Sequence, residues 1–209
     1  MKLKKVKVEN YKCIENSEEF LIDDITCLVG KNEAGKSAIL QALYKLNPIE
    51  EDFASFIETE YPRRFLSTYR ERTESGHANV LTTEWTLDDT DLAYVKEELG
   101  ADPFLSPDIT VSKGYSNIRC WTVQLTEVPV VQRFVQDAEL ESVERASLEK
   151  CDSFTELSAT LSSKEELTSG AQQLLQQVEK NFPNGFSKQV YALLASLLPT
   201  FLYFREYDK

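Results

Sequence analysis

The sequence predicts an α/β fold with a mixed sheet and an inserted helical region, and three observations support this. The apolar run Ile25–Val29 stands directly in front of a glycine-containing loop, Gly30–Ser37, and a helical pattern follows the loop. Strand-like and helix-like segments then alternate as far as Leu125. From about Val131 onward the pattern turns helical and polar. Such alternation is typical of strands and helices that share one α/β domain.

The loop reads Gly-Lys-Asn-Glu-Ala-Gly-Lys-Ser, a complete GxxxxGK[ST] phosphate loop, or Walker A motif. In this motif the glycines aim backbone N–H groups at phosphate oxygens, the lysine reaches the outer phosphates and the hydroxyl ligates Mg²⁺. A glycine turn without a ligand is the alternative, and the flanking strand and helix disfavour it. The sequence thus predicts a P-loop NTPase whose nucleotide-binding residues are Gly30, Lys31, Asn32, Glu33, Ala34, Gly35, Lys36 and Ser37, with Ser37 as the magnesium ligand.

A helix is expected to begin at the loop and to run over 36–46. Ile39, Leu40, Leu43 and Leu46 fall on one face of this helix, which predicts that the face is buried. The N-terminus of the helix has unpaired N–H groups and the positive end of the macrodipole. A polyphosphate at this end is therefore held by charge as well as by geometry.

The other elements follow from hydrophobic period and from turn residues. Strands are expected at Lys2–Val8, Glu19–Ile22, Ile25–Val29, Ala78–Leu87 and Thr200–Phe204, with a hairpin formed by Ile109–Val111 and Ile118–Leu125. Helices are expected at Asp88–Leu99, closed by Gly100, at Lys164–Asn181 behind a capping box of Ser162 or Ser163 with Glu165 or Glu166, and around Val190–Leu198.

Charge and cysteine usage narrow the class of protein. The chain has 209 residues and a formal net charge of −12, which argues against broad binding of a phosphate backbone by its whole surface. No apolar run approaches the about 20 residues of a membrane span. Four cysteines are too scattered for a metal knuckle and occur without a secretory leader, so we expect a cytoplasmic protein. Cys27 is expected in the core, and His77 at the surface.

The sequence lacks a recognisable acidic residue that would help Ser37 to bind Mg²⁺. P-loop hydrolases need an acid at the end of an apolar strand, and in many families an adjacent acid that activates water. The runs Val128–Val131 and Phe201–Phe204 are followed by Gln132 and Arg205, so neither has an acid in place. No Walker B carboxylate is identifiable.

Within the first fifty residues the sequence resembles a known family. Leu28–Pro48 is similar to the N-terminal ATPase segment of the OLD (overcoming lysogenization defect) and RecF-like family, in the wider class of AAA/ABC-type and SMC ATPase heads. Val8–Ile14 is similar to the opening strand and turn of that family. Tyr61–Arg64 and Pro199–Asp208 extend the resemblance.

The resemblance implies an ABC/SMC-head-like N-terminal lobe over 1–209. Its strand-rich, nucleotide-binding region is expected over 1–125, its helical region over 126–198 and a return strand over 199–209. A C-terminal ATPase lobe, with its signature motif and Walker B acid, and any Toprim nuclease domain are expected outside this chain. The implied cofactors are ATP and Mg²⁺, with Asn32 on the γ-phosphate side. The implied partners are a second ATPase lobe or a second copy, and DNA through the full-length assembly.

Other residues keep two interpretations each. Arg63 and Arg64 suit phosphate or a partner head, or they are a solvated pair beside a proline turn. Gln124 is a magnesium-sensing glutamine or an exposed strand residue. Trp85 and Trp121 are expected as core anchors rather than as base-stacking platforms.

Two functional hypotheses result. In the first, the chain is the ATP-binding lobe of an OLD/RecF-like ATPase coupled to DNA processing, DNA repair or phage defence, and it hydrolyses ATP only with its missing lobe. In the second, it is a regulatory or interaction module that binds nucleotide without turnover. A small-molecule kinase is disfavoured, because no acceptor-site acid and no arginine-rich lid follow the loop.

Overall fold

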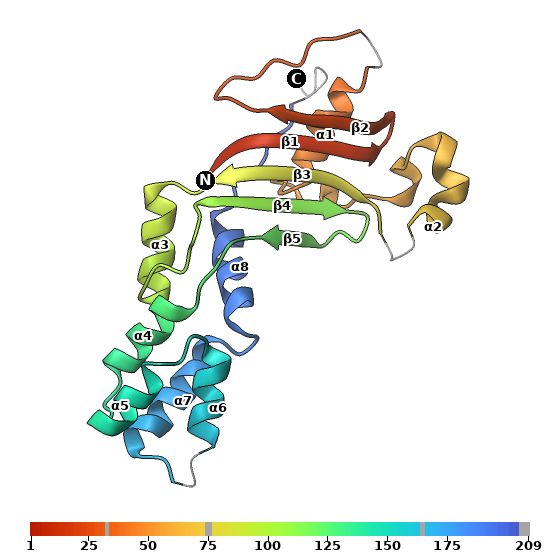
Figure 1. The fold of residues 1–209 in the computed structure, drawn as a ribbon. Coiled ribbons are helices and arrows are strands. Elements are labelled where there is room, and N and C mark those ends of the chain that lie inside the picture. Colours follow the sequence, from red (N-terminus) through yellow and green to blue (C-terminus); the bar gives the residue numbers. More distant parts are fainter. Residues whose placement is uncertain (32–33, 74–76, 164–165, 205–209) are drawn as a thin grey trace. The chain divides into compact units, whose positions relative to one another are not determined.

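The chain divides into two compact units. The computed structural model describes residues 1–31, 34–73, 77–163 and 166–204 (Figure 1). The sheet unit comprises Met1–Thr86, Asp108–Thr122 and Leu198–Lys209, and the helical unit comprises Leu87–Pro107 and Val123–Leu197. The phosphate loop belongs to the sheet unit.

The sheet has five strands in the order β2-β1-β3-β4-β5, and every pairing is antiparallel (Figure 1). The strands are β1 (Lys2–Tyr11), β2 (Ile14–Leu21), β3 (Asn79–Thr86), β4 (Asp108–Gly114) and β5 (Arg119–Thr122). The expected hairpin near Gly114 is confirmed, and β2 begins five residues before the expected strand. The prediction of a mixed sheet is wrong for the described residues, because two segments expected as further strands do not join the sheet.

The segment Ile25–Val29 is the first of these and the clearest correction. It has no strand structure, and Ile25 and Val29 are 93% and 88% exposed. Cys27, expected in the core, is exposed as well. A strand needs a hydrogen-bonded neighbour, and no described segment pairs with this one. The apolar pattern of the run therefore remains without a partner among the residues that the structure describes.

The return segment Thr200–Phe204 is the second. Its pairing is an isolated parallel bridge between Phe201 and Pro48, supported by the Phe201 N–H on the Asn47 carbonyl at 2.8 Å. Leu202 and Phe204 are 60% and 80% exposed, so the expectation of a buried strand is wrong. One bridge is too short to order a strand.

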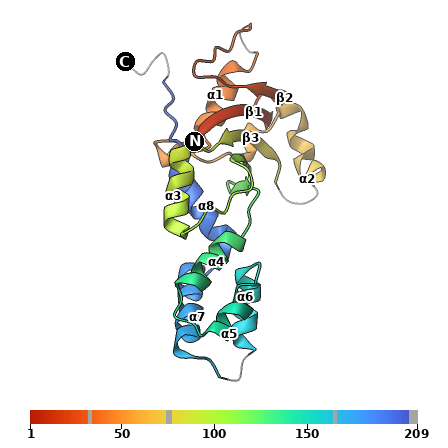
Figure 2. The same cartoon turned by 60° about the vertical axis from the view of Figure 1, so that its left-hand side comes forward.

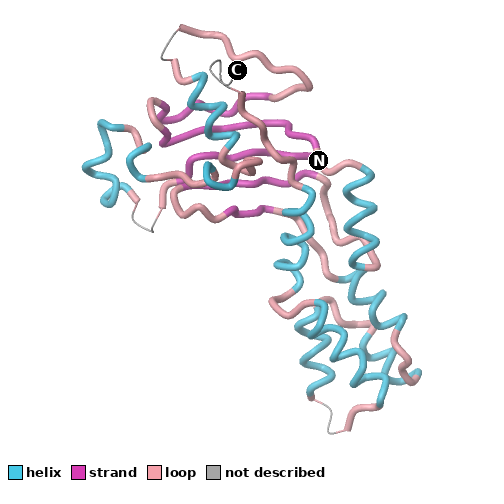
Figure 3. Tube along the Cα trace, turned by 180° about the vertical axis from the view of Figure 1, so that it is seen from behind, coloured by secondary structure: helices cyan, strands magenta, loops and turns pink. Residues whose placement is uncertain are grey.

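Helix α1 (Lys36–Tyr44) covers one face of the sheet; it lies behind the strands in Figure 1 and in front of them in Figure 3, which is turned by 180°. Leu43 and Leu46 are buried as expected, whereas Leu40 is 45% exposed. On the sheet, Val6 and Val8 alternate with the lysines of β1 and are fully buried, so the basic N-terminus is a half-buried strand.

Short elements connect α1 to β3. They are the 3₁₀ helices η1 (Glu51–Phe53), η2 (Glu58–Glu60) and η3 (Arg63–Thr68) and the helix α2 (Tyr69–Arg72). Their aromatic side chains pack into a cluster with those of β1 and of the β4–β5 turn. Edge-to-face or tilted ring contacts join Tyr11, Phe56, Tyr61, Tyr69 and Tyr115. This cluster fixes the segment that carries Tyr61–Arg64.

The helical unit contains α3 (Asp89–Leu99), α4 (Val128–Asp137), α5 (Ser142–Leu148), α6 (Phe154–Ser162), α7 (Ser169–Asn181) and α8 (Phe186–Leu197). Helix α6 packs on α7, and α4 packs on α5 (Figure 2). The core of this unit consists mainly of buried leucine and valine side chains. It also contains a cluster of four phenylalanines, Phe134, Phe154, Phe182 and Phe186. No helix in the described ranges has both the length and the apolar content to cross a membrane.

The predicted helix ends have mixed outcomes. Asp88 caps α3 through its carboxylate, and Gly100 ends it with a left-handed φ of 81°, both as expected. The start of α7 is wrong: Thr168, not Ser162 or Ser163, caps it, and the Thr168 Oγ1 accepts from the Ala171 N–H. Lys164, the expected first residue of this helix, and Glu165 of the expected capping box lie outside the described residues. Helix α8 begins before the expected start at Val190.

Candidate functional site

The phosphate loop turns into α1 at Gly35. This residue is the N-cap of α1 and has a left-handed backbone, with φ 91° and ψ 2°. A Cβ at Gly35 would lie 3.0 Å from the Ile14 side chain and 3.5 Å from the Cys13 sulfur. Any other residue would therefore be strained by its backbone angles and crowded by the β1–β2 turn. The local geometry explains why the motif has glycine here.

The N-terminus of α1 is open to an anion. No side chain caps it, and its first turn has no acidic residue. The first N–H groups of a helix have no intrahelical partner, and the macrodipole makes this end positive. The Ser37 side chain is exposed, and within the described residues its hydroxyl has no hydrogen-bond partner. Backbone donors and a free hydroxyl are therefore available together at this end of the helix.

Lys36 lies across the loop. Its Nζ donates to the Gly30 carbonyl at 2.6 Å and to the Lys31 carbonyl at 2.7 Å. The Ala34 N–H closes the loop on the Lys31 carbonyl at 3.2 Å. The structure thus brings Gly30, Lys31, Gly35 and Lys36 together, whereas Asn32 and Glu33 lie outside the described residues. The ammonium has neutral carbonyl partners that a phosphate can replace.

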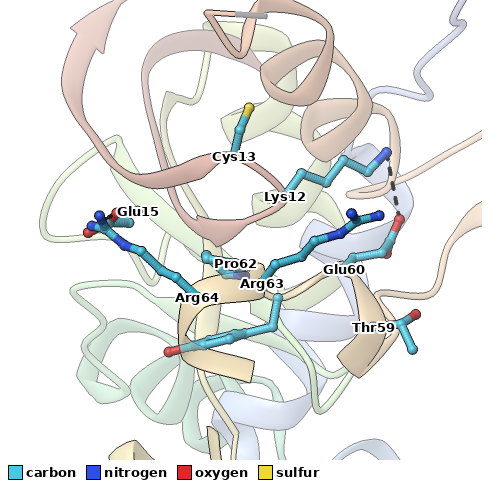
Figure 4. A pocket seen from close by; sticks show the side chains of 9 residues that line it. Lys12, Cys13, Glu15, Thr59, Glu60, Pro62, Arg63 and Arg64 are labelled. Carbon is cyan, nitrogen blue, oxygen red and sulfur yellow. Dashed lines mark ion pairs between the residues drawn. The ribbon is translucent and has the colours of Figure 1, made fainter. Parts of the chain in front are cut away.

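A hollow of about 700 Å³ lies at the β1–β2 turn, and we call it the Lys12 pocket. Its lining comes from the β1–β2 turn and from the segment 59–64, and comprises Lys12, Cys13, Glu15, Thr59, Glu60, Tyr61, Pro62, Arg63 and Arg64 (Figure 4). The Cys13 sulfur, which faces Gly35, joins this pocket to the phosphate loop.

The three cations of the Lys12 pocket differ in their partners. Lys12 contacts Gln41 of α1 and lies 3.9 Å from Glu60, and Arg64 pairs with Glu15. In Figure 4, Arg63 and Arg64 extend in opposite directions. Arg63 is exposed, and no carboxylate among the described residues pairs with it. The two arginines therefore differ: Arg64 is held in an ion pair with Glu15, whereas Arg63 has no carboxylate partner among the described residues.

Glu60 connects the Lys12 pocket to the end of α1. Its carboxylate accepts from the Tyr11 hydroxyl at 3.1 Å and from Lys45 Nζ at 2.6 Å. Burial, and then the nearby Glu60 charge, raise the pKa of Tyr11. The phenol therefore remains a proton donor to Glu60.

A second hollow of the sheet unit, about 290 Å³, is mainly apolar. It lies between the strands, α1 and the return segment, and its lining includes Leu3, Phe20, Leu28, Leu40 and Phe201. The exposed Leu202 belongs to this lining, and the exposed side chains of Leu21, Ile25 and Val29 are adjacent to it in sequence. Patches of this kind mark interaction surfaces.

Neither of the two apolar runs considered from the sequence supplies a strand-end acid among the described residues. The run Val128–Val131 is part of α4 rather than a strand, and residues 205–209 lie outside the described residues. Among the described residues, no three His, Cys, Asp or Glu side chains form a group that could hold a metal.

Other sequence expectations have clear outcomes. Trp85 is 2% exposed, and its indole N–H donates to Thr83 at 2.8 Å, so it is a core residue as predicted. Gln124 follows β5 and is not part of a strand. His77 is exposed as predicted. Sequence reasoning missed Lys113, which is 5% exposed, although its even spacing from Ile109 and Val111 places it on the buried face.

Comparison with known proteins gives the family. The family model for an AAA ATPase domain matches residues 1–169. No curated protein sequence matches the chain. Among solved structures, a chain described for the ATP-driven dimerization and DNA-stimulated activation of SMC ATPases aligns at 12% identity with a TM-score of 0.34, covering 95% of this chain and 100% of that one. A likeness of that degree carries no conclusion. Because the family model covers most of the sequence, the chain belongs to the AAA ATPase domain family.

Proposed function

We propose that the chain binds ATP with Mg²⁺ at the loop Gly30–Ser37. ATP binding is implied by the family, and the observation that carries this location is the open N-terminus of α1 behind the left-handed Gly35. Lys36 supplies a positive charge for the outer phosphates, and Ser37 supplies a hydroxyl for the metal. When bound, Mg²⁺ neutralises phosphate charge and orients the phosphates. The residues present fit this ligand.

The ribose and base are proposed to lie toward the Lys12 pocket. The pocket adjoins Gly35 through Cys13 and is large enough for part of a nucleotide. Lys12 and Arg63 add cationic donors on that side. The Arg63 guanidinium has no carboxylate partner in the described part of the chain, and such a group is a suitable donor for a phosphate or a ribose oxygen.

We propose further that this is the ATP-binding lobe of an OLD/RecF-like ATPase, which needs a second lobe for hydrolysis. Two features support this. The apolar run Ile25–Val29 has exposed side chains and no paired strand among the described residues, and the neighbouring apolar hollow includes Leu28 of the same segment. A partner strand beside Ile25–Val29 would cover both the exposed run and the hollow. Coupling to DNA processing or phage defence rests on the family resemblance alone.

The test is nucleotide binding by variants of the loop. We expect Lys36→Ala to weaken binding of a fluorescent ATP analogue with Mg²⁺ by at least about 100-fold, because it removes charge-assisted contacts to phosphate. Lys4→Ala is the control, since Lys4 is an exposed lysine of β1 outside the loop. Circular dichroism should show both variants folded. Equal affinity in the wild type and Lys36→Ala would refute the site.

The second functional hypothesis is a binding module without turnover. No Walker B carboxylate is identifiable in the sequence, and this favours the binding module as much as it favours a split ATPase. The two differ when a candidate second lobe is added, because only the split ATPase then releases phosphate.

A further inference from the structure

Three side chains hold the backbone of the segment Ala54–Phe56, which we call the connector. It lies between α1 and the Lys12 pocket in sequence. Lys113 of β4 donates to the Ala54 carbonyl at 2.8 Å, and Lys45 donates to the Ser55 carbonyl at 2.8 Å. Asn117 accepts from the Phe56 N–H at 2.7 Å and donates to the Phe56 carbonyl at 3.0 Å. Each connector residue is therefore fixed by a side chain from another element.

Lys113 also holds the end of α1. Its Nζ donates to the carbonyl of Lys45, the C-cap of α1, at 2.7 Å. The C-terminus of a helix carries the negative end of the macrodipole, so a cation is favourable there. Within the described residues, no carboxylate forms an ion pair with Lys113, which is 5% exposed. Its ammonium has the two carbonyls and, 5.9 Å away, the centre of the Phe56 ring as partners. A buried charge without a carboxylate is costly, and a cost retained in the fold suggests a specific role.

The geometry connects Lys113 to the nucleotide site through α1. This helix has nine residues, so it is a rod of about 13 Å. One end of the rod is the phosphate loop, and the other end is the carbonyl that Lys113 holds. If α1 tilts at the end that Lys113 holds, the N–H groups at its other end move relative to the phosphate loop. Even small displacements of such groups weaken their contacts with a ligand.

We propose that Lys113 is a positioning residue for the phosphate loop, acting by holding the end of α1 and the connector together. The inference rests on the proposed nucleotide site. The proposal adds to that site a residue of β4 that lies outside the phosphate loop.

The charge of Lys113 gives this role a measurable signature. Burial, together with the positive charges of Arg119 on β5 and Lys45 after α1, lowers the pKa of Lys113 to about 8. Glu60 is bound to Lys45, so it offsets the charge of that neighbour. Above this pH the amine becomes neutral, and its hydrogen bonds to the two carbonyls weaken. We therefore expect the affinity for Mg²⁺-ATP to fall several-fold between about pH 7 and pH 9.

The experiment compares the dissociation constant for Mg²⁺-ATP at these two pH values in the wild type, Lys113→Met and Lys4→Met. Methionine keeps much of the side-chain length without charge or donors, and Lys4 is an exposed lysine of β1. We expect Lys113→Met to bind about tenfold more weakly near pH 7 and to lose the pH dependence, while Lys4→Met follows the wild type.

A second variant covers the case in which Lys113→Met does not fold. Asn117 has a φ of 60°, so Asn117→Gly keeps the backbone relaxed and removes the hold on Phe56. Weaker nucleotide binding by Asn117→Gly at an unchanged melting temperature supports the proposal. Wild-type affinity in folded Lys113→Met, or in Asn117→Gly when the first variant is unfolded, overturns it. Absence of binding by the wild type overturns the proposed function itself, and this inference with it.

Discussion

At the scale of single residues, the site depends on backbone and charge more than on reactive side chains. Gly35 is required by its left-handed backbone and by the nearby Ile14 and Cys13. The Lys36 ammonium donates to two loop carbonyls, those of Gly30 and Lys31, and these contacts hold it at the loop. These features suit the proposed binding of a polyphosphate. They do not by themselves activate water.

Arg63 and Arg64 provide a matched pair for testing the Lys12 pocket. We expect Arg63→Ala to weaken Mg²⁺-ATP binding by about tenfold, because its guanidinium has no carboxylate partner among the described residues and lines the pocket. Arg64→Ala should change the affinity less than about twofold, since Arg64 pairs with Glu15. A fluorescent nucleotide titration measures both. An equal loss in the two variants would contradict the placement of the ligand.

Lys113 also predicts how stability depends on pH. Its folded-state pKa of about 8 lies below the ordinary value of 10.5, so the unfolded chain binds more protons between these values. The free energy of unfolding should therefore rise as the pH increases above about 8, and the contribution is lost as the pH falls through 8. Tyr11 and Tyr115 act in the opposite sense at higher pH, because their pKa values are raised.

The comparison with Lys113→Met isolates this contribution. Between about pH 8 and pH 9.5, denaturant unfolding should show wild-type stability rising relative to the variant. Parallel curves for the two proteins would show that Lys113 does not titrate in this range.

At the scale of elements, the sequence pattern correctly predicted those helices and strands that depend on residues close together in the chain. The strand at 78–87, the capped helix at 88–99 and the helix behind the loop all formed, because alternation, capping and helical period are local properties. The candidate site could be proposed from the sequence for the same reason, since the loop motif is contiguous. The Lys12 pocket was not, because it joins the β1–β2 turn to residues near 60, and only the fold brings these together.

The failures have a different cause. Ile25–Val29 and Thr200–Phe204 have apolar patterns, but a pattern records what a segment can bury and not which segment covers it. The start of α7 was predicted too early. Ser162, Ser163 and Thr168 are all suitable N-cap residues, and the local sequence alone does not show which of them caps the helix.

The exposed run gives a test at this scale. We expect Ile25→Ser to change the free energy of unfolding of this chain by less than about 0.5 kcal/mol, because Ile25 is 93% exposed. Val8→Ser is the matched control on a fully buried strand position and should cost more than about 2 kcal/mol. Urea unfolding measures both. A large loss in Ile25→Ser would mean that the run is covered within this chain.

At the scale of the whole molecule, the family and the charge set the limits of function. The AAA ATPase domain model covers residues 1–169, which includes the sheet unit up to Thr122 and most of the helical unit. The net charge of −12 makes broad electrostatic binding of DNA unfavourable for the whole surface. The chain is therefore a nucleotide-binding domain, with an apolar face near Ile25–Val29 proposed for a second lobe.

The most direct test is a calorimetric titration of the purified chain with Mg²⁺-ATP, followed by a phosphate-release assay on the same sample. We expect saturable binding of one nucleotide per chain and no release of phosphate. Absence of binding at millimolar ATP would contradict the nucleotide site. Release of phosphate that disappears in Lys36→Ala would contradict the need for a second lobe.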